Sequence, residues 1–317
     1  MSKKRIFLLW LKPLILIALL FVFVFIIVMP QYTTYYTAGL LDKVARLREV
    51  GSPKIVLVGN SNVAFGFDSE KIQNAFGLPV TNMGLHGGLG PAFSENMTKP
   101  YIGNGDIIVL LPADFSASLP NIYNYPLAWL TIENHWHLWK GIAPSDYLGM
   151  IKAFPSYWGK AFSLWMTRTG NQPLSEDEFK SNQRKYFNEY GDIAYPRPAA
   201  MDHFGSDPFY ADITPAMVDY WNQFNEYATN RGAFVYMSYF PIYENTLGDF
   251  EMFQNKLHEQ LSFPLVSDFH DYLYPLSFFY DTYYHLNDHG VQVRTEQLIK
   301  DLSAYVPLAN ATAAVPD

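Results

Sequence analysis

Two short segments of this chain carry residue types that together could perform nucleophilic chemistry. Residues 59–62 read Gly-Asn-Ser-Asn and directly follow the apolar run 55–58, which is typical of a buried strand. The second segment places Asp281 and His285 four residues apart near the C-terminus. A serine hydroxyl needs a base, and an imidazole supplies one when a carboxylate fixes its tautomer. The chemistry predicted is acyl transfer through Ser61, with His285 as base and Asp281 as its orienting acid.

Acyl transfer also needs hydrogen-bond donors where negative charge develops on the substrate oxygen. We expect the backbone N–H groups of Ser61 and Gly84 to serve, since Gly84 follows the apolar segment 78–83 and glycine permits close approach of the backbone. Asn62 is a further candidate oxyanion donor, through its side chain or its N–H. His86, two residues after Gly84, is a candidate substrate-binding residue.

Each of these residues also has an ordinary structural explanation. A Gly-Asn-Ser-Asn sequence after a strand suits a tight turn, and His285 could cap a helix. His86 is equally well explained as a structural histidine, and His289 is the alternative base if His285 points away. The joint occurrence of a serine, a carboxylate and an imidazole favours catalysis over these separate explanations.

The elements that must position these residues alternate along the chain. Apolar segments predict strands, and segments with helical spacing predict helices between them. The predicted strands are 54–58, 78–83, 106–111, 233–238 and 265–269, and the predicted helices are 69–76, 217–230, 247–261 and 287–305. This pattern predicts an α/β fold, a flavodoxin-like three-layer parallel sheet with helices on both faces. Sites in such sheets form at the carboxyl ends of strands, where Ser61 and Gly84 lie.

Residues 115–210 interrupt this alternation and are predicted to form an aromatic-rich insertion or lid. Five of the seven tryptophans lie there: Trp129, Trp136, Trp139, Trp158 and Trp165. These side chains suit either a wall that stacks on sugars or packing in the core or at a membrane surface.

The N-terminus predicts a transmembrane anchor over residues 1–30. Residues 14–29 contain no polar side chain, and a helix needs roughly 20 residues to cross a bilayer. The basic residues Lys3, Lys4 and Arg5 place the N-terminus in the cytoplasm and the body outside. A cleaved signal peptide is the alternative, but no small-x-small cleavage site follows the run. Residues 31–52 then predict a membrane-proximal helix.

Composition excludes several classes of partner and cofactor. The net charge is −8, and the first 30 residues carry four basic side chains and no acid, so the remainder carries −12. Such an acidic body predicts no nucleic acid partner. The chain has no cysteine, which excludes disulfides and thiolate metal sites. We predict no cofactor and no metal, since residues 84–90 lack the nucleotide-binding spacing and His135 and His137 have no evident third ligand.

These motifs resemble those of the SGNH (GDSL) hydrolases over roughly residues 54–114 and 232–304. The Gly-Asn-Ser at 59–61 is similar to the first block, with Asn in place of Asp, and Asn82-Met83-Gly84 to the second, which supplies a glycine oxyanion donor. The Asp281 to His285 spacing is similar to the last block but one residue longer. The third block departs, because Leu111-Pro112-Ala113-Asp114 stands where the family's side-chain oxyanion donor belongs.

The membrane-anchored layout resembles the branch that includes D-alanyl transfer and alginate O-acetylation proteins. This resemblance implies a serine esterase or O-acyltransferase domain over 53–305, followed by a tail at 306–317. Its partners would be an acylated envelope polysaccharide or an acyl carrier, the lipid bilayer and a membrane acyltransferase. The alternative function is a non-catalytic glycan-binding or acyltransferase-partner protein on the same fold.

Overall fold

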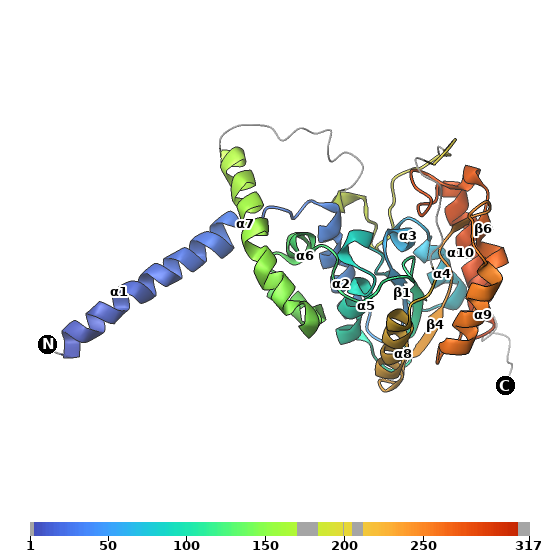
Figure 1. The fold of residues 1–317 in the computed structure, drawn as a ribbon, viewed down its shortest axis with the longest axis horizontal. Helices are drawn as coiled ribbons and strands as arrows, with labels where there is room; N and C mark the ends of the chain where they lie inside the picture. The colour runs from blue at the N-terminus through green and yellow to red at the C-terminus, as the bar shows by residue number, and fades with distance from the viewer. Residues whose placement is uncertain (1–2, 170–182, 199, 205–211, 310–317) are drawn as a thin grey trace.

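The computed structural model describes residues 3–169, 183–198, 200–204 and 212–309, and their body is built on a parallel sheet (Figure 1). The sheet order is β2-β1-β3-β4, and every neighbouring pair is parallel. Its strands are β1 (Ile55–Gly59), β2 (Val80–Asn82), β3 (Ile107–Leu111) and β4 (Phe234–Met237). This architecture confirms the predicted α/β class and the parallel sheet.

Helices cover both faces of the sheet. In β1, Val56 and Val58 face one hydrophobic core, while Ile55 and Leu57 face the other. The first core is completed by α2 (Leu40–Glu49), α5 (Phe93–Thr98), α8 (Pro215–Thr229) and α9 (Phe250–Gln260). The second core is completed by α4 (Ser69–Phe76) and α10 (Asp288–Ser303). Burial on both faces explains why these strands read as uninterrupted apolar runs.

Two predicted elements need correction. Residues 31–52 do not form one helix: a 3₁₀ turn at Tyr36–Gly39 precedes α2. Residues 265–269 do not form a strand, since Leu265 makes only a single bridge to Met237. The pairing stops there because Asp268 accepts the His270 N–H and starts a 3₁₀ turn. A separate two-stranded sheet, β5 (Ile242–Tyr243) with β6 (Leu273–Tyr274), was not predicted.

In the described part of the region 115–210, the α-helices α6 (Tyr125–Ile132) and α7 (Tyr147–Thr169) pack on each other. The N-terminal helix α1 (Lys3–Val22) continues as a π-helix over Phe23–Val28 and projects away from the body (Figure 1). Its 19 residues Trp10–Val28 have a mean hydropathy of 3.0 and are long and apolar enough to cross a membrane.

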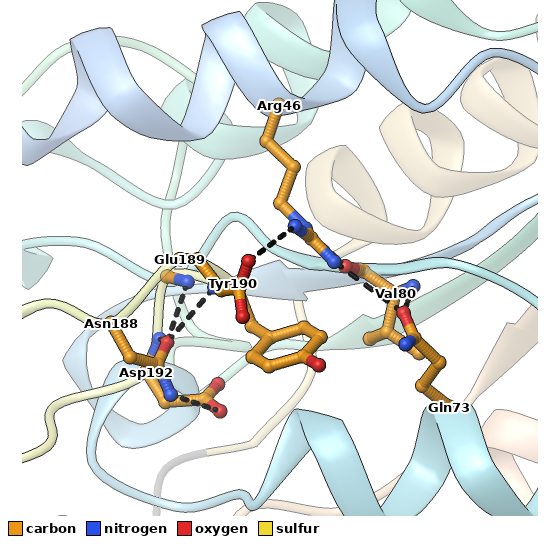
Figure 2. A network of polar contacts seen from close by, with 8 residues as sticks. Arg46, Gln73, Val80, Asn188, Glu189, Tyr190 and Asp192 are labelled. Carbon is orange, nitrogen blue, oxygen red and sulfur yellow. Dashed lines mark hydrogen bonds and ion pairs between the residues drawn. The ribbon is translucent and has the colours of Figure 1, made fainter.

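A polar loop, residues 188–192, covers the edge strand β2. Arg46 of α2 donates to Val80 O at 2.7 Å and lies over the ring of Tyr190 (Figure 2). The backbone carbonyl of Tyr190 accepts the Asn82 N–H. Asn188 holds this loop closed by accepting the N–H groups of residues 190–192. Arg46 and the loop therefore provide hydrogen-bond partners for backbone groups that an uncovered edge strand would leave unpaired.

Glu95 on α5 makes stability depend on pH. It is 1% exposed, and neither carboxylate oxygen accepts a hydrogen bond from another described residue. Burial raises its pKa to about 7. Glu95 therefore ionises at a lower pH in the unfolded chain than in the folded protein. The stabilisation that is present below about pH 4.5 is lost as pH rises through 7. The free energy of unfolding falls by about 2 kcal/mol between pH 5 and pH 8.

We expect Glu95→Gln to remove this loss, because the amide does not ionise. The measurement is the free energy of unfolding at pH 5 and pH 8, with the exposed Glu259→Gln as the control. An unchanged pH dependence in Glu95→Gln would contradict this account of Glu95.

Candidate active site

Ser61 lies where β1 passes into the short helix α3 (Ser61–Ala64), as its first residue. Asn60 caps this helix, since its Oδ1 accepts the Asn62 N–H at 3.0 Å. Gly59 is required before the turn because an added Cβ would lie 2.6 Å from Leu111 O. Ser61 is partly exposed, and its N–H and Oγ make no hydrogen bond within the described part of the chain.

A buried arginine fixes the position of α3. Arg294 of α10 donates to Asn62 O at 2.7 Å, to Asn62 Oδ1 at 2.9 Å and to Tyr239 O at 2.9 Å. Its residue exposure is 0%, and burial lowers its pKa to about 10, so it remains charged at neutral pH. Arg294 therefore ties the helix that begins at Ser61 to the C-terminal helix and to the segment after β4.

The Asp281 and His285 side chains form the predicted pair. His285 Nδ1 lies 2.7 Å from Asp281 Oδ1, and the imidazole stacks on Phe65 with ring centroids 4.1 Å apart and planes at 8°. The loop is held by the Tyr280 N–H, which donates to His285 O at 2.9 Å. The carboxylate and the Phe65 ring together fix the orientation of the imidazole.

His285 is not a helix cap, because Asn287 caps α10 by accepting the Gly290 N–H at 3.0 Å. The alternative base, His289, lies exposed on the first turn of α10, against Phe278. Of the two histidines, His285 is the one that lines a cavity with Ser61.

Ser61 and His285 line the same cavity, of about 370 Å³. The wall is mainly aromatic and aliphatic, and it consists of Tyr35, Tyr36, Thr37, Ser61, Phe65, His86, Gly87, Leu127, Leu130 and His285. This volume lies in the range of small-molecule sites, roughly 300–1,000 Å³. Ser61 and His285 are not hydrogen-bonded to each other within the described chain, and such contacts often form only with substrate bound.

His86, the predicted substrate-binding residue, also lines the cavity. Its Nδ1 accepts the Gly88 N–H at 2.9 Å, which leaves Nε2 as the proton-bearing nitrogen of the neutral ring. Partial burial lowers the pKa of His86, and the nearby His285 lowers it further. A neutral imidazole at the cavity wall can donate one hydrogen bond to a ligand.

The two predicted oxyanion donors beyond Ser61 already have partners. The Gly84 N–H donates to Asn82 Oδ1 at 2.8 Å, and the missing Cβ of Gly84 makes room for Val63. Asn62 is 0% exposed, its N–H and Nδ2 both donate to Asn60 Oδ1, and its own Oδ1 accepts from Arg294. Neither residue lines the cavity, so both hold α3 in place and neither offers a free donor.

Two other donors lie beside Ser61, and the sequence prediction missed both. The Gly87 N–H, in the cavity wall, has no acceptor among the described residues. Because Asn60 Oδ1 accepts two N–H bonds from Asn62, its Nδ2 must point the other way, and it lies 3.6 Å from where a Cβ on Gly87 would be. The sequence signal that could have pointed to Asn60 as a donor is that Asn stands here in place of the usual Asp of the first SGNH block.

No protein-family model matches this chain, and no curated protein matches it either. The resemblance to SGNH hydrolases therefore stays a prediction from the sequence motifs.

We expect Arg294→Lys to destabilise the fold by about 2–4 kcal/mol, because lysine cannot reach three buried acceptors in one plane. Arg231→Lys is the matched control: Arg231 is exposed and donates to one carbonyl, Tyr227 O, so its loss should stay within about 0.5 kcal/mol. Denaturant unfolding of the full chain in detergent micelles measures both. Equal losses of stability in the two variants would show that the hydrogen bonds of Arg294 do not hold α3 and α10 together.

Proposed function

We propose that this protein is a membrane-anchored serine esterase or O-acyltransferase that acts on acyl groups of cell-envelope polysaccharide. The observation that carries the proposal is that Ser61 and His285, more than two hundred residues apart in sequence, line one cavity of about 370 Å³, and that Asp281 holds His285 Nδ1. A serine that only forms a turn and an Asp–His pair that only stabilises its own loop would not need to lie at the same cavity. The pair also has the orientation that a general base needs, with Nδ1 held by the carboxylate and Nε2 left for the serine.

In the proposed reaction Ser61 Oγ attacks the acyl carbonyl carbon, and its proton passes to His285 Nε2. The tetrahedral intermediate then collapses, the bond to the leaving oxygen breaks, and His285 returns the proton to that oxygen. Water or a sugar hydroxyl next attacks the acyl-serine, with His285 again as base, and Ser61 is regenerated. Asp281 keeps its negative charge throughout and stabilises the imidazolium.

The apolar part of the cavity suits the acyl group. Phe65, Leu127 and Leu130 line the cavity together with Ser61. The oxyanion would be met by the N–H groups of Ser61 and Gly87 and by Asn60 Nδ2. In this arrangement Asn60 supplies both the helix cap and the side-chain donor that the degenerate third block lacks.

The substrate is proposed to meet the enzyme at the membrane. Three of the cavity residues, Tyr35 to Thr37, follow Val28, the last residue of the apolar helix, by seven to nine positions. The basic Lys3, Lys4 and Arg5 favour a cytoplasmic N-terminus, which would place the cavity on the outer side. An acylated polysaccharide or an acyl carrier at the outer surface fits this placement.

We expect Ser61→Ala and His285→Ala to reduce hydrolysis of a short-chain acyl ester by 10⁴-fold or more, on the order seen when a catalytic triad is broken. The full-length protein in nanodiscs is the sample, and Ser116→Ala, an exposed serine outside the cavity, is the control. Turnover that survives in a folded Ser61→Ala protein would remove Ser61 from the mechanism. Glycan binding unchanged in that variant, with no turnover in the wild type, would favour the binding-protein function.

We expect Asn60→Asp to lower kcat at least 10²- to 10³-fold, because the carboxylate keeps the cap acceptor but replaces the Nδ2 donor with a charged oxygen that repels the oxyanion. The melting temperature should stay close to that of the wild type, which separates loss of a donor from loss of the helix. A kcat equal to the wild type would show that Asn60 does not meet the oxyanion.

A further inference from the structure

Aromatic side chains join the end of the apolar N-terminal helix to α7. Phe23 lies 5.8 Å from Trp165 and 6.4 Å from Phe162, measured between ring centroids. Phe25 lies 5.7 Å from Phe154 and 5.4 Å from Trp136. Phe23 and Phe25 belong to the same 19-residue apolar stretch, Trp10–Val28, that is long enough to span a bilayer. Helix α7 therefore contacts the span itself.

The depth of this contact follows from helix geometry. Nineteen residues at the α-helical rise of 1.5 Å extend at most about 28 Å, close to the hydrocarbon thickness of about 30 Å. Phe23 lies five residues before the end of the stretch, and because these last residues form a π-helix, which rises less per residue, it lies up to about 8 Å inside the end. Helices that lie in a membrane interface bury their apolar face about 5–10 Å. A helix that packs on Phe23 is therefore at the depth of the interface.

The surface of α7 divides into three strips. Its first strip, with Met150, Tyr157 and Ala161, is buried against the body. The second strip carries Phe154, Phe162 and Trp165, the rings of α7 that contact Phe23 and Phe25. The third, next to the second by helical spacing, leaves apolar side chains exposed to solvent: Leu148 at 60%, Ile151 at 64% and Met166 at 50%.

Charge and orientation agree with a lipid surface. The sequence of α7 contains Lys152 and Lys160 and no acidic residue, although the body as a whole is acidic. In Figure 1, α7 runs crosswise to α1 at the inner end of α1, between α1 and the rest of the body. If α1 stands across a bilayer, α7 lies along its surface. Trp136 and Trp165 then occupy the level where tryptophan concentrates at membrane boundaries.

We propose that α7 is an interfacial helix that inserts its exposed apolar strip, Leu148, Ile151 and Met166, into the outer leaflet. This inference rests on the membrane anchor in the proposed function but not on the acyl-transfer chemistry. Lipid is the occupant favoured over a second protein because the strip is continuous with the residues that contact the apolar span. Since α6 packs on α7 and supplies Leu127 and Leu130 to the cavity, membrane contact would also fix the height of the cavity above the bilayer.

The experiment uses nitroxide labels on single cysteines, which the cysteine-free chain permits without further substitution. The variants are Ile151→Cys on α7, Leu16→Cys on α1 and Met252→Cys on α9, and all three parent side chains are exposed. The full-length protein is reconstituted in nanodiscs, and relaxation by oxygen, which concentrates in lipid, is compared with relaxation by a water-soluble nickel chelate.

We expect the labels at positions 16 and 151 to respond several-fold more to oxygen than to nickel, and the label at 252 to respond in the reverse order. A lipid response at 16 with a water response at 151 would overturn the interfacial helix and leave the anchor intact. A label at 151 shielded from both reagents would overturn it in favour of a protein occupant, a second copy or a partner. A water response at 16 would overturn the anchor and α7 insertion together, without bearing on the Ser61 chemistry.

Discussion

The hydrogen bonds of one buried guanidinium connect the two halves of the candidate site. Arg294 lies on α10, the helix that begins just after His285, and its donors reach Asn62, the residue after Ser61. Gly66 has no side chain where the guanidinium passes, and Phe67 lies 4.3 Å from it, face on. Together with the stacking of His285 on Phe65, these hydrogen bonds hold the serine turn and the histidine loop in one arrangement, although the two segments are more than two hundred residues apart in sequence.

The same interaction determines which groups remain for chemistry. Because Arg294 can only donate, it fixes Asn62 Oδ1 toward itself, and Asn62 then donates its own N–H groups to Asn60 Oδ1. This order leaves Asn60 Nδ2 facing Gly87 at the cavity wall. A charge this deeply buried costs free energy, and three hydrogen bonds from its two terminal nitrogens to amide and backbone oxygens offset part of that cost, while Nε has no acceptor among the described residues. Stability and site geometry therefore depend on one set of bonds.

Local signals explain what the sequence predicted. The helix at 69–76 has exactly its predicted bounds because Asp68 caps it and Gly77 ends it in the left-handed conformation, and β1 follows from its apolar run. The Asp281–His285 contact was also visible in the spacing. The oxyanion prediction failed because side-chain hydrogen bonds take up the predicted donors. The Gly84 N–H donates to the Asn82 side chain two residues before it, and Asn62 donates to Asn60 Oδ1 in a network that Arg294, 232 residues away, holds in place. Arg294 itself reads in sequence as an ordinary helix-surface arginine.

The central claim is that Ser61 is a nucleophile. The most direct measurement is mass spectrometry of the full-length protein after treatment with a fluorophosphonate, followed by trypsin. The account predicts one covalent adduct on the peptide spanning residues 55–71, with fragment ions that assign it to Ser61 rather than to Ser69. No adduct on this peptide in folded protein, or an adduct on another serine, would contradict it.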